Sequence, residues 1–521
     1  MRAVARYILI GALSLSGLLL AARAALGPLA APVPVHSPLN AEAIFGISLT
    51  LLLLLAAADR SQPGPLRRFQ PVDAALALGL LCLIAAAFSR TLAFYFLSDD
   101  FVLLKLAQGF HAAWRPLFTT AGGDGFYRPL GYLSLAATSL WAGSNPALWH
   151  AFGLALHAAN CILVFCLARR FTASRWAAFF AAALFAIHGT RPEAVVWIAG
   201  RFDLLATFFV LAGLLLFLRP GGLYKLASLL SMALAMIVKE SAYVFPFLLI
   251  LLLASDGSLS RIRLRALIPF FSLAAVLFLY RWTLFGGIGG YRQDALGFLP
   301  ALKALTLRSW AVLYFPINWS VEPGGLYAGA IAALIVSLAL LASGRPRRKH
   351  LALAAGFVLL AALPPLPQLL IGPDLQKSRL LYLPSIGFCL LLAVAVDGLH
   401  GRLRWIAPGL LLLAGLALLQ QNLDAWEYVS ARVQPACLAA AQCAGSAGKL
   451  TVGPLPGSLR GVYLFQNGFP ECVELQRHGP PLQLDFAAPS PAAQWDPAAN
   501  RLKCYLGASK STSRDSDWNL R

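Results

Sequence analysis

Long apolar runs recur along most of this sequence, and they restrict its fold more than any other feature. Leu- and Ala-rich runs of about 15–24 residues follow one another from Tyr7 to Leu419. A helix of roughly 20 apolar residues crosses a bilayer, where every backbone polar group must bond within the protein. Charged residues make up only 12% of the chain, against about 25% in a soluble domain. The sequence therefore predicts an all-α polytopic membrane protein.

The apolar runs predict about thirteen transmembrane helices. The predicted spans are 7–29, 41–58, 73–96, 147–168, 175–189, 202–218, 223–238, 241–255, 264–284, 326–343, 351–371, 380–397 and 405–420. Two further stretches, 129–142 and 304–318, break the alternation of charge if they are counted, and would raise the number to fifteen. We interpret them as amphipathic or re-entrant helices at the outer face.

The basic residues predict the orientation of the spans. Nineteen Lys and Arg residues occupy short loops in alternate gaps between the runs, and the positive-inside rule assigns such loops to the cytoplasm. They are Arg2, Arg6, Arg60, Arg67, Arg68, Arg169, Arg170, Arg175, Arg219, Lys225, Arg261, Arg263, Arg265, Arg345, Arg347, Arg348, Lys349, Arg402 and Arg404. We expect a multi-pass protein of a bacterial inner membrane, with its N-terminus inside and everything after Gln420 in the periplasm. The net charge of +20 sits in these short clusters, which disfavours nucleic acid as a partner.

Three regions are expected. Residues 1–72 hold two extra N-terminal spans and a cytoplasmic loop, 73–420 form the transmembrane core, and 421–521 form a soluble tail on the outer side. The first predicted span also has the charge and small-residue pattern of a cleavable signal peptide. Of the two alternatives, we favour an uncleaved transmembrane span.

The tail predicts a small domain that contains β-structure. Its segments VYLFQ, CVELQ and LQLDF alternate apolar and polar residues between Gly and Pro turns. Four of the eight cysteines lie there, namely Cys437, Cys443, Cys472 and Cys504. In an oxidising compartment they can form two disulfides, whose pairing the sequence leaves open, and the alternative is four reduced thiols.

The predicted outer face collects ionisable residues from several separate loops. Such groups are costly near a bilayer, so a shared polar site is the economical explanation, and ordinary solvated loop charge is the alternative. The carboxylates are Asp99, Asp100, Asp124, Glu193, Asp203, Glu240, Asp294, Glu322 and Asp374, and the cations are Arg128, Arg191, Arg201, Lys239, Lys377 and Arg379.

The sequence SDDF marks the point where the third span ends. Its adjacent carboxylates, Asp99 and Asp100, repel each other, which tends to raise the proton affinity of one of them. Such a group suits the removal of a proton from an acceptor hydroxyl. The alternative is that the pair only caps the following helix. Arg128, in the sequence YRPL, follows 28 residues after Asp100.

A second motif, HGTRPEAVVWIAGRFDLL, combines a Pro-containing turn with a short helix. We expect His188, Glu193, Arg201 and Asp203 to support the site. The alternative is an interfacial anchor with Trp197 in the headgroup region.

Two further elements supply cations. Lys239 and Glu240 lie between two apolar runs, either as a snorkelling pair at a tight turn or with the ammonium placed against a phosphate. The segment LQKSRLLYLPS carries Lys377, Arg379 and Tyr382 at the start of the twelfth span. Cations at the rim of an apolar groove suit a lipid phosphate or pyrophosphate.

At these residues the chain resembles the GT-C superfamily of glycosyltransferases that use polyprenyl-phosphate sugars. The pattern is similar to the membrane part of the tetratricopeptide-bearing O-mannosyltransferases and their bacterial relatives. The motifs that carry this resemblance, in order over about residues 95–400, are SDDF, YRPLGYLSLA, LWHAFGLALHAANCILVFCLARR, EAVVWIAGRFDLL, the KE pair and LLYLPSIGF.

The resemblance implies transfer of a sugar from a dolichyl- or undecaprenyl-phosphate donor, with inversion, outside the cytoplasm. It implies that Asp99 or Asp100 is the catalytic base, with Asp99 favoured. It makes Arg128, Lys239 and Arg379 candidate contacts of the donor phosphate. It places Glu193, Arg201 and Asp203 in the supporting shell. Two motifs depart from the family, since HGTRPE stands where members read HPVHTE, and KSRLLYLPS where they read ERYLYLPS. The sugar and the acceptor are therefore the least transferable features.

No nucleotide cofactor is expected, because the chain has no P-loop and no G-x-G-x-x-G at a strand-to-helix turn. No metal is assigned, although a divalent Mg or Mn bridging an Asp and the phosphate is possible in principle. The expected partners are the lipid bilayer, a polyprenyl-phosphate sugar and an acceptor that the sequence does not identify. The main alternative functions are a transporter or flippase for lipid-linked glycans and an O-antigen-ligase-like enzyme. A non-catalytic scaffold built around the tail is disfavoured, because it would not explain the carboxylates on the outer face.

Overall fold

The computed structural model describes most of the chain. The described residues are 2–27, 38–57, 70–110, 125–255, 260–287, 289–290, 297–322, 324–445, 449–477, 483–486 and 491–504. Asp124, Asp294, Arg60, Arg67 and Arg68, which the sequence analysis named, lie outside these ranges.

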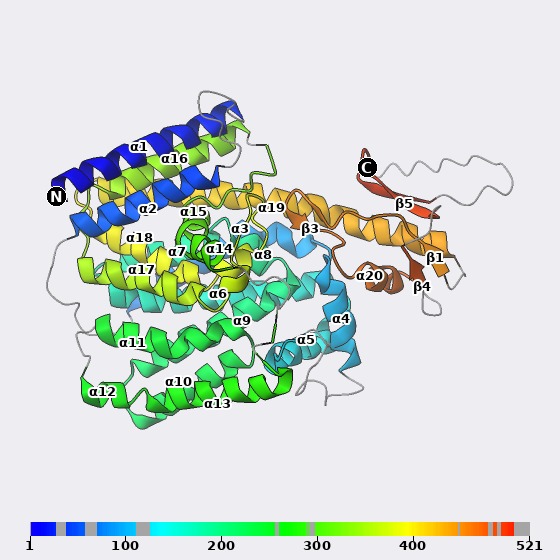
Figure 1. Cartoon of the computed structure of the whole chain (residues 1–521), viewed down its shortest axis with the longest axis horizontal. Coiled ribbons are helices and arrows are strands. Elements are labelled where there is room, and N and C mark those ends of the chain that lie inside the picture. The colour runs from blue at the N-terminus through cyan, green and yellow to red at the C-terminus, as the bar shows by residue number, and fades with distance from the viewer. Residues whose placement is uncertain are drawn as a thin grey trace. The chain divides into compact units, whose positions relative to one another are not determined.

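Helices account for most of the described residues (Figure 1). The α-helices are α1 (Arg2–Leu26), α2 (Leu39–Ala56), α3 (Pro71–Phe88), α4 (Asp99–Gly109), α5 (Pro129–Ala142), α6 (Pro146–Phe171), α7 (Arg175–Ile187), α8 (Arg191–Val195), α9 (Arg201–Phe217), α10 (Gly222–Met236), α11 (Phe245–Ser255), α12 (Arg261–Arg265), α13 (Ile268–Phe285), α14 (Phe298–Lys303), α15 (Ser309–Tyr314), α16 (Gly325–Leu341), α17 (Arg348–Ala362), α18 (Pro384–Asp397), α19 (Leu403–Ala444) and α20 (Phe469–Leu475). Shorter turns are η1 (Ser89–Ala93), η3 (Ile198–Gly200), η4 (Glu240–Val244), the π-turn η5 (Ala304–Arg308), η6 (Leu366–Gln368) and η7 (Ser378–Leu381). The strands are β1 (Lys449–Thr451), β2 (Ser458–Leu459), β3 (Val462–Tyr463), β4 (Gln483–Asp485), β5 (Ala493–Asp496) and β6 (Arg501–Cys504).

The chain divides into two compact units. The first contains Met1–Phe94, Leu103–Glu427 and Arg460–Val462, and the second contains Tyr95–Val102, Tyr428–Leu459 and Tyr463–Arg521. Each unit is described by itself below.

The predicted helical membrane protein is confirmed in its coarse form. A helix lies at each of the thirteen predicted spans, and seven helices of the described part are long and apolar enough to cross a membrane. These seven are Val4–Leu26, Leu39–Ala56, Pro71–Ala93, Pro146–Phe171, Ile198–Phe217, Arg263–Phe285 and Leu403–Ala444. The number thirteen and the orientation stay predictions.

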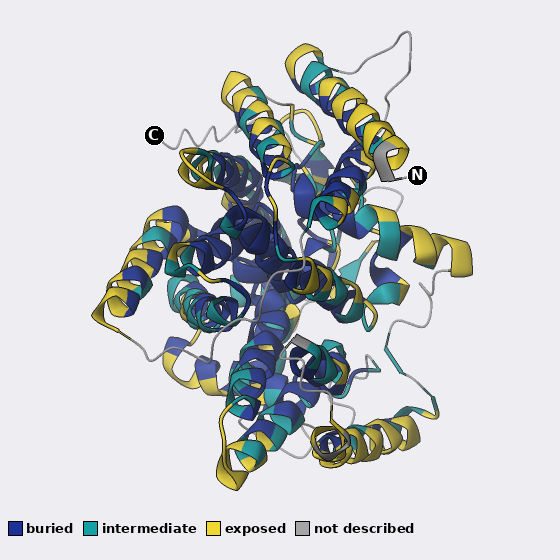
Figure 2. Ribbon diagram, turned by 90° about the vertical axis from the view of Figure 1, so that its left-hand side faces the viewer, coloured by how far each residue is buried: buried dark blue, intermediate teal, exposed yellow. Residues whose placement is uncertain are grey.

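Helix α18 forms the centre of the first unit. Every residue of it from Pro384 to Val396 is buried, and it packs against α7 and α17. Figure 2 shows buried residues in the middle of the helical bundle and exposed residues on the outer helices. Such a helix is apolar on all sides because it has no face toward solvent or lipid.

Local sequence signals explain where several helices begin. The side chain of Asn145 accepts a hydrogen bond from the amide of Ala147 (3.1 Å) and precedes a proline at the first position of α6. The hydroxyl of Ser174 accepts from the amide of Trp176 (3.2 Å) at the start of α7. Both side chains satisfy amides that a helix leaves without partners at its N-terminus.

The two stretches interpreted as outer-face helices differ from each other. Residues 129–142 form α5, while 304–318 form η5, the short α15 and a non-helical end. All six residues of α15 are buried, and the helix packs against α2. Residues 309–318 of this second stretch are buried, whereas 305–308 are partly exposed, so its interpretation as an outer-face helix stays a prediction.

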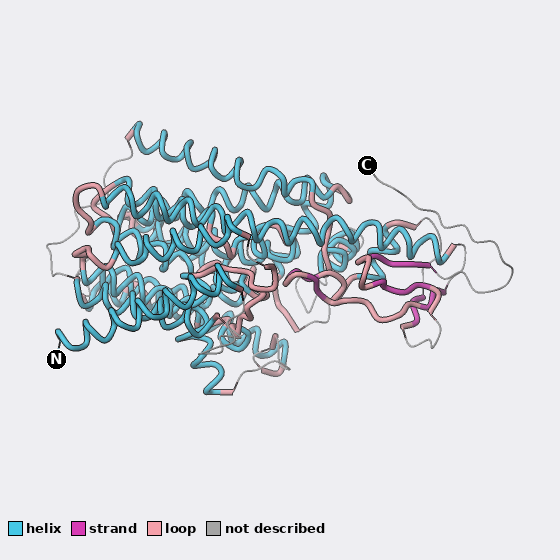
Figure 3. Tube along the Cα trace, turned by 90° about the horizontal axis from the view of Figure 1, so that it is seen from above, coloured by secondary structure: helices cyan, strands magenta, loops and turns pink. Residues whose placement is uncertain are grey.

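The second unit contains most of the strands, which Figure 3 draws in magenta. Strand β1 pairs in parallel with β4, and β5 pairs with β6 in antiparallel register. Two of the predicted β-segments contain strands. The third, CVELQ, is helical: all but its last residue belong to α20, which has a proline in its first turn. The structure also extends α19 through the predicted boundary at residue 420 as far as Ala444.

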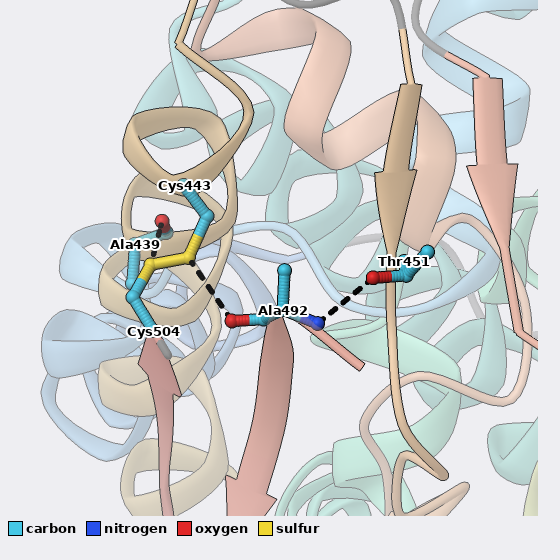
Figure 4. The surroundings of a disulfide bond; sticks show 5 residues. All are labelled: Ala439, Cys443, Thr451, Ala492 and Cys504. Carbon is cyan, nitrogen blue, oxygen red and sulfur yellow. Dashed lines mark hydrogen bonds between the residues drawn. A yellow bond between two sulfur atoms is a disulfide. The ribbon is translucent and has the colours of Figure 1, made fainter. Parts of the chain in front are cut away.

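Two disulfides connect elements of the second unit. Cys437 of α19 is bonded to Cys472 of α20, and Cys443 of α19 is bonded to Cys504 of β6. Figure 4 shows the second bond beside the amide of Ala492, which donates a hydrogen bond to the hydroxyl of Thr451 (2.8 Å). The structure thus selects one pairing among those that the sequence left open.

Candidate functional site

The first unit contains a cavity of about 360 Å³ that is lined by both charged and apolar side chains. Its charged lining residues come from four separate segments: the start of α5, the first turn of α9, the connection between α10 and α11, and α13. The lining residues are Phe126, Arg128, Asp203, Lys239, Glu240, Ser241, Arg281, Gly289, Gly290, Pro364, Pro365, Pro367, Gln368, Leu380 and Leu383. Concave sites of this size with a few converging polar groups are typical of ligand pockets.

Glu240 links two arginines in this cavity. Its Oε2 lies 2.7 Å from Nη2 of Arg128, and its Oε1 lies 3.0 Å from Nη1 of Arg281. The arginine side chains are only 9% and 7% exposed, and that of Glu240 is 23% exposed. Two guanidinium groups thus contact the same carboxylate, whose single negative charge balances only one of their two positive charges.

A separate ion pair lies on the same cavity wall. Nζ of Lys239 donates to Oδ2 of Asp203 over 2.5 Å, and both side chains are almost completely buried. Asp203 stands in the first turn of α9, where the helix dipole favours a negative charge. Lys239 follows the last turn of α10, and its amide donates to the carbonyl of Ala235 (3.0 Å).

Close backbone packing holds these side chains in place. The amide of Leu130, in α5, donates to the carbonyl of Ile237 at the end of α10 (3.3 Å). At Gly131 an added Cβ would lie 2.4 Å from the ring of Phe202, so only glycine allows α5 to approach α9 this closely. The same phenylalanine ring lies 5.3 Å from the guanidinium of Arg128, and the ring of Phe126 lies 4.0 Å from it.

The described residues that line the cavity carry a net charge of +1. They include three cations (Arg128, Lys239 and Arg281) and two carboxylates (Asp203 and Glu240). Glu240 lies in the turn between α10 and α11; burial alone would raise its pKa, but Arg128 and Arg281 outweigh this effect and lower the pKa to about 2. The carboxylate is therefore ionised at neutral pH, and the cavity as a whole favours an anionic ligand.

The predicted cation Arg379 has another partner. Glu193 of α8 accepts hydrogen bonds from the amides of Lys377 and Arg379 (3.1 and 3.2 Å), from the hydroxyl of Ser378 (3.0 Å) and from the guanidinium of Arg379. The Arg379 guanidinium also lies over the ring of Trp197, 4.5 Å from its centroid. Neither Lys377 nor Arg379 belongs to the cavity lining described above, which the same segment reaches through Leu380 and Leu383.

Three other predicted residues lie in the interior of the first unit. The hydroxyl of Tyr382 is bonded to Nδ1 of His157 (2.7 Å), and its side chain does not line the cavity. His188 contacts the hydroxyl of Thr190 and the carbonyl of Leu313, each over 2.9 Å. Arg201 donates to the hydroxyl of Thr138 (2.8 Å). These side chains hold helices together around the site.

The two adjacent aspartates belong to the second unit, and their environments differ. Asp100 is 1% exposed, and its Oδ2 accepts a hydrogen bond from the amide of Leu97 (3.0 Å). Oδ1 of Asp99 accepts from the side-chain amide of Asn467 (2.7 Å) at an exposed position. Asp100 therefore has a structural bond to the backbone at the start of α4, while Asp99 is the more accessible carboxylate.

Arg281 and Gln368 are cavity residues that the sequence analysis did not single out. Arg281 lies near the end of α13, inside the predicted span 264–284, and an ionisable residue within a span is a signal that could have identified it. Gln368 has no comparable signal. Among the described residues, no three His, Cys, Asp or Glu side chains gather as a metal ion would require.

Sequence comparison identifies relatives over part of the chain. The protein O-mannosyl-transferase Tmtc1 of Drosophila melanogaster is 34% identical over 134 residues, which are 25% of this chain and 16% of that protein. The human protein O-mannosyl-transferases TMTC2 and TMTC1 are 31% identical over 154 residues and 30% identical over 195 residues. These matches cover 27% and 32% of this chain, and 18% and 22% of the human proteins.

Over these residues the chain is similar to protein O-mannosyl-transferases, the group of enzymes that the motifs resembled. The chain spans less than a quarter of the length of these relatives, and no family model matches it.

Structural comparison gives more distant similarities. The crystal structure of ArnT from Cupriavidus metallidurans in the apo state has a TM-score of 0.42 and 13% identity, over 79% of this chain and 86% of that one. The crystal structure of ArnT bound to undecaprenyl phosphate has a TM-score of 0.43 and 12% identity, over 79% and 85%.

Proposed function

We propose that this chain is a membrane glycosyltransferase that moves a sugar from a polyprenyl-phosphate donor to an acceptor hydroxyl, with inversion, on the periplasmic side of a bacterial inner membrane. The relationship to O-mannosyl-transferases supports the reaction class. The observation that carries the donor class is the cavity in which Arg128, Lys239 and Arg281 meet beside a wall of prolines and leucines. Its cations suit a phosphate, and its apolar wall suits a lipid chain.

The charge of the cavity fits this reaction. A polyprenyl-phosphate sugar is a phosphodiester with one negative charge, which matches the net charge of +1 of the lining residues. When the bond between the anomeric carbon and the phosphate oxygen breaks, the electron pair stays on the phosphate oxygen, and the negative charge of the phosphate increases. Arg128 and Arg281 lie on either side of Glu240 at the cavity wall, where they can stabilise this developing charge more than that of the bound donor.

The acceptor must lose a proton as it attacks the anomeric carbon. We assign this proton to the carboxylate of Asp99, which the resemblance to GT-C enzymes favours and which is more accessible than that of Asp100. The new bond forms on the sugar face opposite the departing phosphate, so the product has the inverted anomeric configuration.

Donor binding provides the first test. The full chain in nanodiscs is titrated with a radiolabelled decaprenyl-phosphate mannose and bound label is counted. Arg281→Gln should weaken binding about 10- to 100-fold, as expected for loss of a charged hydrogen-bond donor. The control is Arg90→Gln, because Arg90 is likewise held by carboxylates, those of Asp424 and Glu427, but does not line the cavity. Equal affinity of both variants and the wild type would contradict the proposal.

Transfer provides the second test. The same donor is incubated with serine- and threonine-containing peptides and with a glycolipid, and labelled product and free decaprenyl phosphate are measured. Asp99→Asn should lower release of decaprenyl phosphate at least about 100-fold, as is typical for loss of a general base, while donor binding is retained. Full activity of Asp99→Asn would exclude this base. Passage of labelled donor across vesicles without product would instead favour a flippase. Parallel assays with EDTA, Mg²⁺ and Mn²⁺ test the metal requirement.

A further inference from the structure

A second large cavity lies in the first unit, at the opposite end of α18 from the candidate site. Its volume is about 400 Å³. Leu383, beside the first residue of α18, lines the candidate site, whereas Val396 and Asp397, the last two residues of α18, line the second cavity. With a rise of 1.5 Å per residue, the 14 residues of α18 separate the two cavities by roughly 20 Å. The second cavity is therefore not part of the candidate site.

The walls of this cavity are aromatic and aliphatic. It is formed by α7, the end of α18 and the start of α19, through residues that include Trp176, Phe179, Trp405 and Leu412. The rings of Trp176 and Trp405 meet edge to face with their centroids 5.9 Å apart, and about half of each side chain is exposed. Tryptophans at such partly exposed positions are typical of the membrane–water interface.

One cation borders the cavity without a carboxylate to neutralise it. The guanidinium of Arg404 lies 4.9 Å from the centroid of the Trp405 ring, and no ion pair joins it to any carboxylate of the described residues. The carboxylate on the cavity wall, Asp397, is occupied elsewhere. It accepts hydrogen bonds from the amides of Ala173 and Ser174 (2.8 and 3.2 Å) and pairs with Arg347 over 3.7 Å.

More positive charge gathers around this end of α18. The amide of Arg345 donates to the carbonyl of Gly398 (3.2 Å), which places the basic segment 345–349 beside the end of α18. Arg402 follows in the next turn, and Arg404 is the second residue of α19. These are loops that the positive-inside rule assigns to the cytoplasm, where anionic lipids attract juxtamembrane cations by about 1 kcal/mol per Lys or Arg.

We propose that this second cavity, the Trp176–Trp405 groove, binds an anionic glycerophospholipid of the surrounding bilayer. The acyl chains lie against Phe179, Pro408 and Leu412, and the anionic headgroup faces Arg404. Charge complementarity selects this occupant over a neutral phospholipid, because no carboxylate of the described part of the chain pairs with Arg404 at the rim. The proposal is independent of the proposed glycosyl transfer.

Gly409 allows the groove to be filled from within. It lines the cavity, and an added Cβ would meet no atom within 4 Å. Gly409→Phe therefore places a ring in the open space without a clash in α19. Gly79 of α3 is the matched control, since a Cβ there also meets nothing within 4 Å and Gly79 does not line this cavity.

The experiment measures quenching of tryptophan fluorescence by lipids with brominated chains. The full chain is placed in phosphatidylcholine nanodiscs that contain a small fixed share of brominated phosphatidylglycerol or, in parallel, of brominated phosphatidylcholine. The fluorescence quenching that the wild type shows and the double variant Trp176→Phe with Trp405→Phe lacks is assigned to lipid in the groove; we call it the groove signal. We expect the groove signal to show about fivefold higher occupancy by the anionic lipid, which corresponds to about 1 kcal/mol for one arginine.

The variants separate the alternatives. Arg404→Gln should abolish the preference for phosphatidylglycerol while quenching by both lipids persists. Gly409→Phe should reduce quenching by both lipids, and Gly79→Phe should behave as the wild type, which also controls for folding. Equal quenching by the two lipids in the wild type would overturn the proposal, as would an undiminished groove signal in Gly409→Phe.

Discussion

The buried pair of Lys239 and Asp203 gives a quantitative test of how the candidate site is held together. Its N–O distance is 2.5 Å, and the two side chains are 10% and 8% exposed. Removing one partner of a buried pair costs about 3–5 kcal/mol, because the other charge stays buried without compensation. Since Lys239 lines a cavity that water can enter, we expect Asp203→Asn to cost about 3 kcal/mol of unfolding free energy, the lower end of that range.

Removing both charges should restore most of this loss. The double variant Asp203→Asn with Lys239→Met leaves no buried charge, so its unfolding free energy should lie within about 1 kcal/mol of the wild type. Lys239→Met alone leaves the Asp203 carboxylate buried without compensation and should cost a similar amount, so a double-mutant cycle would give a coupling energy of at least about 5 kcal/mol. The assay is reversible unfolding of the full chain in mixed micelles by increasing SDS, followed by tryptophan fluorescence.

An exposed pair serves as the control for this cycle. Arg90 and Asp424 are 2.6 Å apart, but their side chains are 30% and 55% exposed, so solvent screens them. Their coupling energy should be about 0–1 kcal/mol. The reasoning is refuted if Asp203→Asn costs less than about 1 kcal/mol, or if the two single effects at Asp203 and Lys239 simply add.

Three further predictions follow from other described contacts. The pKa of Glu240 is lowered from 4.5 to about 2, so the stability that its ion pairs provide is complete above pH 4.5 and is lost as the pH falls toward 2. The difference in unfolding free energy between the wild type and Glu240→Gln should therefore shrink between pH 4.5 and pH 2. A difference that stays constant over this range would contradict the prediction. Gly131→Ala should cost about 1–3 kcal/mol, because the new Cβ would lie 2.4 Å from the Phe202 ring, whereas Gly79→Ala, with open space, should be neutral or stabilising in the same SDS titration. The disulfide between Cys437 and Cys472 closes a loop of 35 residues, so replacing both cysteines by alanine should destabilise the second unit by about 4 kcal/mol, and limited proteolysis should cut the tail faster than in the wild type; an unchanged cleavage rate would argue against this bond.

The helices of the first unit could be predicted from the sequence because apolar runs between charged loops leave few alternatives to a membrane helix. The same runs located four of the five charged cavity residues, since Arg128, Asp203, Lys239 and Glu240 interrupt or flank them. Arg281 was missed because it lies inside an apolar run and its partner, Glu240, is 41 residues away in the chain.

Partner choice was the least predictable property. Nothing local in the sequence indicates that Glu193 binds the segment 377–379 or that Tyr382 binds His157. The tail shows a similar limit, because CVELQ alternates like a strand, while the proline at its helix start and the bond from Cys472 to α19 favour a helix. Short segments of this kind take their structure from tertiary contacts more than from periodicity.

The five-residue helix α8 has a consequence for how the cavity meets its ligand. Glu193 binds the backbone and side chains of residues 377–379. The guanidinium of Arg191, two residues earlier at the start of the same short helix, donates to the hydroxyl of Ser385 (2.6 Å). The stretch between them delivers Leu380 and Leu383 to the cavity wall. Both ends of that stretch are thus fastened before any ligand arrives, so the entropy of ordering this wall is already lost on folding and does not weaken binding.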